Sequence, residues 1–452
     1  MSKRVLKLLC LTIIMIFSLA VILSGCGSDN DTSSSDTGTK AASDDQSARK
    51  VTLRYAYNWT TGDSKGQYYE PALKSYMEKN KDTVEISLEG TPGMEHKDKI
   101  KVDLAGNNLP DVFMYWTGEA DLKPLVDGDT ILDMDEFFSA SKNTKKEQWN
   151  EGAFSSSKVG GKLFTLPVES FKGFFLCNKA LFEKYKLQYP KTYAELKTVS
   201  KVFIENGIVP INMASKGGNP GHLFLNAVGY QLKDGWKDSQ TIAQTKKYNT
   251  ESNLNAAKII DEMRKEKMFP SDTIANGDWG PAVALYNEQK AAMVYCFPWK
   301  IGDIKKEIAD VSEVVPFPKM EGAELSTDDF AIGGVSMGVL INKKSFADAS
   351  KKQAIIDFVD YLVSDAMFTE LGKASMMPAK NVKLDASQLN ALFVKAVDFT
   401  STQKFTYDPT WALFPGSDTT QSYADALDEL FAGAITPEQY VEKVQTAVDS
   451  AK

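Results

Sequence analysis

Tryptophans mark the ends of several strand-like segments, and some of them stand beside acidic or amide side chains. These tryptophans are Trp59, Trp116, Trp279, Trp299 and Trp411. Asp63 follows the first of them within a few residues, and Glu119 follows the second. An indole ring can cover the flat C–H face of a sugar, while carboxylate and amide groups bind the hydroxyls. The pattern therefore predicts a site for a hydroxyl-rich ligand such as a carbohydrate.

Three such contacts would give a useful affinity. A stacked ring contributes about 0.5–1.5 kcal/mol by analogy with aromatic pairs, and a charge-assisted hydrogen bond contributes about 1.5–3 kcal/mol. Together they would reach micromolar binding, which corresponds to about −8 kcal/mol. A single tryptophan is more often a core residue than a ligand platform. The prediction therefore rests on the repeated placement beside Asp, Glu or Asn.

A GxSxG pattern at Gly334–Gly338 raises the alternative of a serine hydrolase with Ser336 as nucleophile. That fold places its histidine after the serine in the chain. Both histidines, His96 and His222, precede Ser336. We interpret the segment as a glycine-rich strand or loop that another backbone or a ligand can approach closely.

Metal chemistry has little support in the sequence. The chain has two histidines and no HExxH or CxxC pattern, so a transition-metal enzyme is not expected. An acidic stretch, Asp127, Asp129, Asp133 and Asp135, does not have the spacing of a calcium loop. We interpret its carboxylates as solvated turn and helix-start residues, and we expect no metal and no other cofactor.

The acidic composition limits the class of partner. The chain of 452 residues carries a formal net charge of −8. Nucleic acid is excluded as an expected partner, because phosphate binding needs clustered cations. Arginine is rare, and its bidentate fork is the preferred partner of phosphate and carboxylate groups. This scarcity weakly disfavours an anionic ligand.

The N-terminus has the pattern of a bacterial lipoprotein signal. Lys3, Arg4 and Lys7 precede an apolar run over 8–23, shorter than the ~20 residues of a membrane-spanning helix. The run ends in Ser-Gly before Cys26, so 1–25 is expected to be cleaved and Cys26 to carry lipid. A plain signal anchor with a chance cysteine is the alternative.

The polar segment that follows predicts where the protein is held. Residues 26–50 are rich in Ser, Asp, Thr and Gly, which is typical of a flexible tether. The expected location is the outer face of a bacterial cell membrane, with a Gram-positive source favoured. The body beyond the tether exceeds the usual size of a single core, so two lobes are expected.

Short strand-like and longer helix-like patterns alternate along the body, which indicates an α/β fold. Segments 51–57, 84–88, 111–116 and 173–177 are predicted strands. Helix starts are marked by capping patterns at Thr192 with Glu195, and at Thr436 with Pro437 and Gln439.

Cys177 and Cys296 are the cysteines of the body. An extracellular location permits a disulfide between them. Two buried free thiols are an equal alternative, since sequence does not fix the distance between their Cα atoms.

Several motifs appear in the order of a known family. They are Asn107–Phe113 (NNLPDVF), Leu132–Phe137 (LDMDEF), Leu166–Ser170 (LPVES), Cys177–Phe182 (CNKALF), Pro190–Leu196 (PKTYAEL), Asn287–Met293 (NEQKAAM) with Trp299, and Phe431–Glu438 (FAGAITPE). The body resembles the extracellular solute-binding proteins of family 1, the relatives of maltose-binding protein that serve ABC sugar importers. Cys177 stands where the family usually has tyrosine, and Gln289 and Phe297 stand where it has glycines.

The resemblance implies a two-lobed periplasmic-binding-protein fold (Venus-flytrap, type II) with the ligand cleft between the lobes. One lobe would comprise 51–172 with 314–372, and the other 173–313 with 373–452. Site residues carried over from the family are Glu119, Glu169, Trp299, Gly333 and Gly334. The remaining candidate ligand-binding residues come from the tryptophan pattern: Trp59, Asp63, Trp116, Trp279 and Trp411.

The expected function is an extracellular sugar or oligosaccharide receptor that closes on its ligand and delivers it to an ABC permease. The protein is expected to be monomeric and not an enzyme. The alternatives are a surface glycoside hydrolase that uses Glu119 and Glu169, a receptor for a non-sugar solute, and a co-receptor for a sensor kinase.

Overall fold

The structure is a computed structural model that describes residues 50–275, 277, 281–414 and 416–451. The predicted signal peptide, Cys26 and nearly all of the predicted tether lie outside these residues, as does Trp279. No described helix has the length and apolar character needed to cross a membrane.

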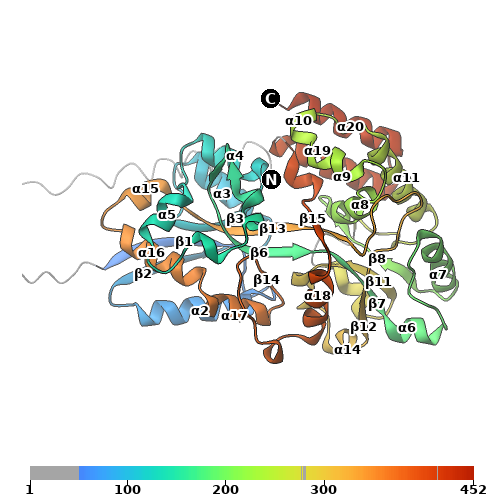
Figure 1. The fold of residues 1–452 in the computed structure, drawn as a ribbon, viewed down its shortest axis with the longest axis horizontal. Helices are drawn as coiled ribbons and strands as arrows, with labels where there is room; N and C mark the ends of the chain where they lie inside the picture. Colours follow the sequence, from blue (N-terminus) through green and yellow to red (C-terminus); the bar gives the residue numbers. More distant parts are fainter. Residues whose placement is uncertain (1–49, 276, 278–280, 415, 452) are drawn as a thin grey trace, which may run out of the picture. The chain divides into compact units, whose positions relative to one another are not determined.

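The first lobe is built on a mixed sheet with the strand order β14-β6-β13-β3-β1-β2. β1 runs parallel to β2 and β3, whereas β13 is antiparallel to both β3 and β6. The strands are β1 (Val51–Tyr57), β2 (Val84–Gly90), β3 (Val112–Trp116), β6 (Leu166–Lys172), β13 (Phe330–Ile341) and β14 (Met377–Pro378). The helices of this lobe are α2 (Gly66–Lys79), α3 (Glu95–Ala105), α4 (Glu119–Asp127), α5 (Met134–Ala140), α15 (Lys343–Ala347), α16 (Lys352–Leu362) and α17 (Asp365–Lys373) (Figure 1).

The second lobe is built on a smaller sheet with the order β12-β7-β11-β8. Its strands are β7 (Phe174–Asn178), β8 (Val209–Asn212), β11 (Ala291–Cys296) and β12 (Ser312–Val315). Its helices are α6 (Lys179–Lys184), α7 (Tyr193–Glu205), α8 (Gly221–Gly229), α9 (Gly235–Gln240), α10 (Ile242–Thr245), α11 (Glu251–Lys265), α12 (Ala284–Asn287), α13 (Pro298–Ile301), α14 (Lys306–Ala309), α18 (Ala391–Ser401), α19 (Ser417–Ala432) and α20 (Pro437–Ser450).

Short elements complete the lobes and their connections. They are β4 (Lys158–Val159), β5 (Lys162–Leu163), β9 (Ser215–Lys216), β10 (Asn219–Pro220), β15 (Phe405–Tyr407), η1 (Lys146–Gln148), η2 (Glu151–Ser157), η3 (Pro281–Val283), η4 (Ala386–Gln388) and η5 (Thr410–Leu413). β15 pairs with the start of β13, where the chain passes from the second lobe to the first.

The capping patterns mark the helix starts as the sequence predicts. Thr192 accepts a hydrogen bond from the Glu195 backbone N–H, and the Glu195 carboxylate accepts one from the Thr192 N–H. The same reciprocal pair joins Thr436 and Gln439 at the start of α20. These bonds satisfy N–H groups that have no partner inside the helix.

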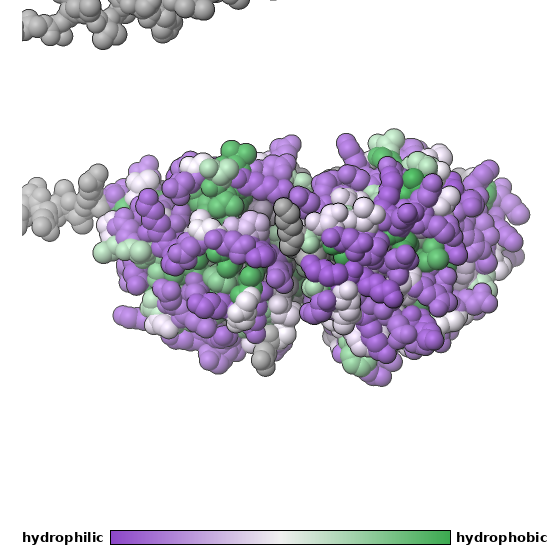
Figure 2. Space-filling view, turned by 90° about the horizontal axis from the view of Figure 1, so that it is seen from above, coloured by the Kyte–Doolittle hydropathy of each residue, from purple (hydrophilic) through white to green (hydrophobic). Residues whose placement is uncertain are grey.

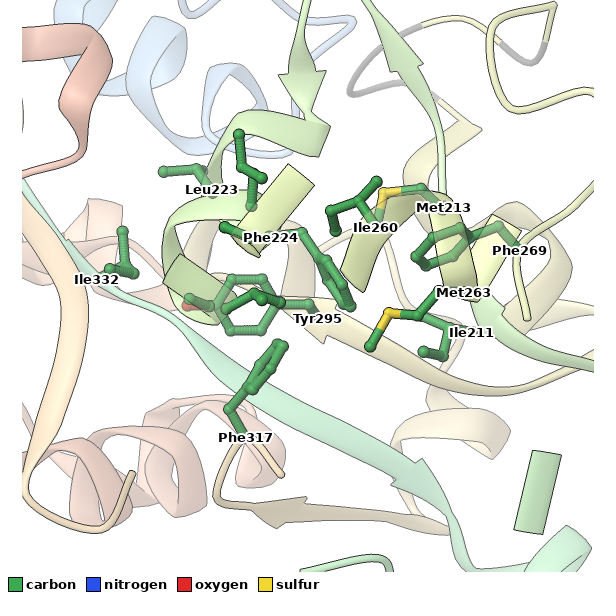
Figure 3. Close-up of a cluster of buried hydrophobic side chains, with 14 of the residues drawn as sticks. Ile211, Met213, Leu223, Phe224, Ile260, Met263, Phe269, Tyr295, Phe317 and Ile332 are labelled. Carbon is green, nitrogen blue, oxygen red and sulfur yellow. The ribbon is translucent and has the colours of Figure 1, made fainter. Parts of the chain in front are cut away.

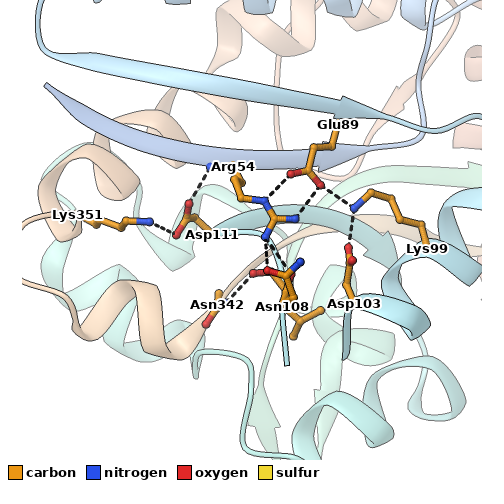
Figure 4. Close-up of polar contacts among 9 residues, drawn as sticks. Arg54, Glu89, Lys99, Asp103, Asn108, Asp111, Asn342 and Lys351 are labelled. Atoms are coloured by element: carbon orange, nitrogen blue, oxygen red, sulfur yellow. Dashed lines mark hydrogen bonds and ion pairs between the residues drawn. The ribbon is translucent and has the colours of Figure 1, made fainter. Parts of the chain in front are cut away.

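A polar network holds the strands of the first lobe in register (Figure 4). The Arg54 guanidinium on β1 donates to Glu89 on β2, with 2.6 Å between Nε and Oε1. The Arg54 backbone N–H donates to the carboxylate of Asp111, which precedes β3 and also pairs with Lys351. The network therefore ties β1 to β2 on one side and to the start of β3 on the other, and β3 carries Trp116 at its far end.

The buried side chains in the core of the second lobe include residues from the segment that leads back to the first lobe (Figure 3). The ring centroids of Phe317 and Tyr295 are 5.2 Å apart, and Ile332 belongs to the same cluster of buried side chains. The predicted limit between 313 and 314 falls inside β12, whose ladder with β7 runs from Ser312 to Val315. The lobe limits stay a prediction, and this pairing favours a crossover within β13.

Cys177 and Cys296 are free and buried. Met293 lies opposite Cys177 in the ladder of β7 and β11, so Cys296 is three positions further along, roughly 10 Å at the rise of a strand. A disulfide needs Cα atoms within about 7 Å. The alternative of two free thiols is therefore the correct one, and burial raises the pKa of Cys296 to about 12.

Candidate functional site

The glycine-rich segment is part of β13 and is not a nucleophile elbow. A Cβ on Gly333 would lie 2.4 Å from the Phe171 carbonyl oxygen, and one on Gly338 would lie 2.1 Å from the Thr165 methyl carbon. Side chains are therefore excluded where β13 passes β6, as the interpretation of close backbone approach predicts. The register between the strands shifts at Ser336.

Glu169 on β6 is the most enclosed of the predicted site carboxylates, with 4% of its surface exposed. Its Oε2 accepts a hydrogen bond from Ser336 Oγ at 2.9 Å. Its Oε1 lies 3.3 Å from Lys65 Nζ and has no hydrogen bond to a described residue. Burial lowers the pKa of Lys65, but the charges of Glu169, Asp63 and Asp303 outweigh it and raise the pKa above its usual value.

Trp59 and Asp63 hold this lysine in place. Trp59 is 1% exposed and packs edge-on against Tyr69 in the core of the first lobe. Its ring lies 5.3 Å from Lys65 Nζ, and Asp63 Oδ1 accepts the Lys65 backbone N–H at 2.8 Å. We call Lys65, Glu169, Ser336, Trp59 and Asp63 the inner cluster.

Trp299 lies on the same side of β6 as Glu169. Its ring stacks on Phe297 with centroids 5.1 Å apart and meets Phe171 edge-on, also at 5.1 Å. Phe171 and Glu169 are two residues apart on a strand, so their side chains share one face. Trp299 comes from the second lobe and is half-buried, so one part of its surface is open to solvent.

Trp116 and Trp411 come together around one ammonium group. Lys97 Nζ lies 5.2 Å from the Trp116 ring and 5.8 Å from the Trp411 ring. It also pairs with Asp121 on α4 at 2.6 Å. Trp411 belongs to η5 in the second lobe, against which α4 packs. We call Lys97, Asp121, Trp116 and Trp411 the bridging cluster, since it joins the lobes.

Glu119, the remaining predicted carboxylate, is exposed in the first turn of α4. Gly118 before it has φ +109°, and a Cβ there would lie 3.4 Å from the Ala412 carbonyl oxygen of the second lobe. The two lobes thus make direct contact at the end of β3.

The tryptophan pattern did not single out Asp408. Its Oδ1 lies 2.4 Å from where a Cβ on Gly334 would be, and Gly334 has φ +146°. Burial raises the pKa of Asp408 to about 6. Asp408 stands three residues before Trp411, so the rule of an acid beside a tryptophan could have found it.

A cleft of about 470 Å³ lies between the lobes beside the bridging cluster. Its walls combine residues of α3 and α4 with residues around β9, β10 and α19. They are Met94, Lys97, Asp98, Lys101, Asp121, Lys216, Gly217, Asn219, Gly277, Trp411, Thr420, Gln421 and Ala424. Figure 2, which shows the side where α3, α4 and α19 lie, has a hollow between the lobes.

Two α/β lobes that meet over a polar cleft with an indole in its wall define the architecture of a solute-binding protein. The chain belongs to the family of bacterial extracellular solute-binding proteins, whose family model matches residues 59–367.

Curated relatives and solved structures share this architecture. The chain is 21% identical over 401 residues to the melibiose/raffinose/stachyose-binding protein MelE of Bacillus subtilis (strain 168), covering 84% of this chain and 83% of that one. A chitin oligosaccharide binding protein superposes with a TM-score of 0.76 at 19% identity, covering 89% and 99%. A structure from work on xylan utilization by Caldanaerobius polysaccharolyticus gives 0.77 at 23% identity, covering 88% and 99%. The two-lobed fold is confirmed.

Proposed function

We propose that the protein is the sugar-binding receptor of an ABC importer, which encloses a sugar or oligosaccharide between its lobes and delivers it to the permease. The observation that carries this proposal is the inner cluster beside Trp299. The Glu169 carboxylate and the Lys65 ammonium would bind sugar hydroxyls, and the Trp299 indole would cover a face of the sugar ring. Membership of the solute-binding family and the sugar named for MelE support it.

The predicted ligand-binding residues have different roles in this proposal. Trp299, Trp116 and Trp411 would stack on sugar rings, while Glu169, Glu119 and Asp63 would accept hydroxyl hydrogens. The backbone of Gly333 and Gly334 would allow the ligand to approach β13. Trp59 would act through Lys65, since its ring is enclosed by the core. The predicted role of Trp279 is retained as part of the proposal.

Closure of the lobes would couple binding to delivery. A ligand that contacts both lobes stabilises the closed state, whereas one held equally in both states would shift nothing. β6, β13 and the segment before β15 connect the lobes, so we propose the hinge there. No bond of the ligand has to break, and we propose that the protein is not an enzyme.

Location and partners complete the proposal. Cleavage after Gly25 and lipidation of Cys26 would anchor the protein as a monomer at the outer face of a bacterial, Gram-positive, cell membrane, with 26–50 as tether. Incorporation of a palmitate analogue into the wild-type chain, and not into the Cys26→Ser variant, would test the anchor. In a strain that lacks the gene, sugar uptake and the induction of sugar-utilisation genes would both be measured. Loss of uptake would indicate transport, and loss of induction with uptake intact would indicate a sensor co-receptor.

The test of the central function is calorimetric titration of the mature chain, carrying Cys26→Ser, with a panel of neutral mono- and oligosaccharides. We expect one ligand per chain with micromolar or tighter affinity, and recovery of the sugar intact after prolonged incubation. Shortened sugars would establish the glycoside hydrolase instead. Binding only of a non-sugar solute would overturn the choice of ligand.

A further inference from the structure

We propose that Gly302 is a positioning residue for ligand binding, because its missing side chain lets the second lobe pack directly on Ser64 of the first. This inference rests on the proposed function, since it names a residue through which closure on a sugar would act. Gly302 ends α13, three residues after Trp299, and Ser64 comes directly before Lys65. We call the packing of Gly302 on Ser64 and on the Ala374 carbonyl the closing contact.

The closing contact joins the backbone of the second lobe to two places in the first. A Cβ on Gly302 would lie 2.9 Å from both Cβ and Oγ of Ser64, and 3.3 Å from the Ala374 carbonyl oxygen. Ser64 precedes α2 and Ala374 follows α17, so both belong to the first lobe. Carbon atoms that are not bonded pack at about 3.5–4.0 Å. A side chain at position 302 therefore does not fit while the lobes are together.

The backbone at Gly302 does not itself require glycine. Its φ is −61° and its ψ is −23°, a helical conformation that residues with side chains adopt freely. Helix ends that need glycine hold it in the left-handed region, as Gly433 is held with φ +71°. The three atoms nearest to a Cβ on Gly302 all belong to the first lobe. What excludes a side chain at this position is therefore the contact between the lobes.

The turn that carries Gly302 is fixed to the second lobe. The Asn287 side-chain amide donates to the Asp303 carbonyl oxygen at 2.9 Å, and its Oδ1 accepts the Lys305 backbone N–H at 3.0 Å. The Asp303 carboxylate also pairs with Lys300, which is 6% exposed. Because these bonds hold the turn on both sides, it resists moving away from an added methyl group.

Ser64 is fixed to the first lobe in a similar way. The Lys65 backbone N–H donates to Asp63 Oδ1 at 2.8 Å, and the Asp63 N–H donates to the Thr60 carbonyl oxygen, also at 2.8 Å. Lys65 Nζ lies 3.3 Å from the Glu169 carboxylate. Ser64 therefore stands between two residues that are held in place. Since close-packed segments give way little to added volume, a side chain at 302 would be accommodated by separating the lobes.

Charge acts in the same direction beside the closing contact. Asp303 of the second lobe adds to the negative charge around Lys65 of the first. Opposite charges attract more strongly where protein replaces water, so this pair favours the lobes being together. Trp299 lies on the same helix as Gly302. Packing and charge thus both hold Trp299 beside the inner cluster, where it would cover a sugar ring.

The first test asks whether the closing contact forms in solution without ligand. Cysteine replaces both residues, as Ser64→Cys with Gly302→Cys, in the mature chain carrying Cys26→Ser. Diamide accepts the two hydrogens when the thiols join, and mass spectrometry detects their loss. We expect this disulfide to form, because its Cβ atoms need to be only about 3.8 Å apart. The pair S64C/G106C, whose second site ends α3 of the first lobe, is the control and should stay reduced.

The second test measures the effect of a side chain at 302. Calorimetry would compare Gly302→Ala with the chain otherwise unchanged, against neutral sugars that include raffinose and maltotriose. We expect affinity to fall by about tenfold, which corresponds to about 1.4 kcal/mol. The denaturant midpoint without ligand should not fall, since each lobe keeps its own contacts. Ser64→Gly removes the opposing Cβ and Oγ, so S64G/G302A should recover most of the affinity.

Gly106→Ala is the matched control for this test. Gly106 also ends a helix with a helical backbone, at φ −81°. The atoms within 4 Å of a Cβ there are carbonyl oxygens of its own helix, those of Val102 and Asp103. The variant G106A should therefore bind each sugar as tightly as the chain without it.

The outcomes separate the role of Gly302 from the receptor function. Equal affinity of G302A and G106A, or a loss that S64G does not restore, would overturn the role of Gly302 while the receptor function stands. A pair S64C/G302C that stays reduced would overturn the closing contact in the same way. Failure of every sugar to bind would overturn the receptor function, and the role of Gly302 in binding with it, even where the disulfide forms.

Discussion

The inner and bridging clusters contain the same kinds of group, a lysine, a tryptophan and a carboxylate, but they differ in which lobes supply them. In each, a lysine ammonium lies over an indole, at 5.3 Å from Trp59 or 5.2 Å from Trp116, and pairs with a carboxylate. The inner cluster draws all its members from the first lobe. The bridging cluster adds Trp411 of the second lobe.

The inner cluster can therefore be formed before the lobes close, whereas the bridging cluster is complete only when they are closed. The contacts among the members of the inner cluster lie within the first lobe, and Asp303 of the second lobe only adds to the negative charge around Lys65, so these groups can be in place before the ligand arrives. The contact of Lys97 with Trp411 requires the lobes to be together. Changes to the first should therefore alter stability and intrinsic binding, and changes to the second should alter the closing equilibrium.

The largest effect is expected for Glu169→Gln. The substitution removes the nearest countercharge of the buried Lys65 ammonium and leaves Asp63 at 3.8 Å, so the loss of unfolding free energy should approach the cost of a broken buried ion pair, about 3–5 kcal/mol. Denaturant unfolding without ligand measures it. The exposed Glu119→Gln is the matched control and should change stability by less than about 0.5 kcal/mol. Removing both charges, in K65M/E169Q, should recover most of the loss. Equal losses for E169Q and E119Q would contradict the enclosed ion pair.

A buried neutral histidine stands behind each tryptophan of the bridging cluster. His96 Nε2 lies 2.7 Å from the Met114 carbonyl oxygen, and His222 Nδ1 lies 3.0 Å from that of Gly218. Burial lowers the pKa of each imidazole to about 4. The unfolded chain, with a pKa of about 6.5, takes up protons first as pH falls. Each histidine should therefore remove roughly 2–3 kcal/mol of stability between pH 6.5 and 4.

Asp408 acts in the opposite direction, because its folded pKa of about 6 lies above the unfolded value. The native state takes up that proton first, and this offsets part of the loss between pH 6 and 4. Denaturant unfolding at pH 7 and pH 5 would measure the balance. The same measurement on the single variants H96N and H222N would show how much each histidine contributes to the pH dependence of the unfolding free energy. An unchanged pH dependence in both variants would contradict the buried neutral state.

The sequence predicted local features such as helix starts better than contacts between residues that are far apart in the chain. The helix starts at Thr192 and Thr436 depend on neighbours three residues away, so their patterns are complete within a short segment. Trp59 and Trp116 both follow strand-like runs beside polar residues, yet only Trp59 is enclosed. What distinguishes them is packing against Tyr69, which no local pattern encodes.

The lysines of both clusters were missed for the same reason. Lys65 and Lys97 are two among 52 basic residues, most of which are ordinary surface charges. Their roles depend on carboxylates brought close by the fold, such as Glu169 on β6. The lobe limit was likewise placed by resemblance, whereas the pairing of β12 with β7 depends on strands far apart in the chain.

Lys97→Met tests the bridging cluster. The change removes the ammonium between the two indoles, a contact that contributes about 0.5–2 kcal/mol. We expect ligand affinity to fall by about fivefold, with a larger radius of gyration in solution scattering without ligand. Lys123→Met removes an exposed pair with Asp127 on the neighbouring α4 and is the control. If K97M and K123M bind equally well, the lysine does not stabilise the closed state.

Salt should give the smallest difference between the clusters. The Debye length falls from about 10 Å at 0.1 M to about 3 Å at 1 M, so charges near solvent are screened while enclosed pairs are not. The side chain of Asp121 is 14% exposed and that of Glu169 is 5% exposed. The fivefold effect of K97M on affinity should therefore shrink to about threefold in 1 M NaCl, because only part of it is Coulombic. The destabilisation by E169Q, measured in urea at both salt concentrations, should stay within about 0.5 kcal/mol. A larger salt effect on E169Q than on K97M would reverse the comparison, since it would mean that solvent reaches the inner ion pair more freely than the one between the lobes.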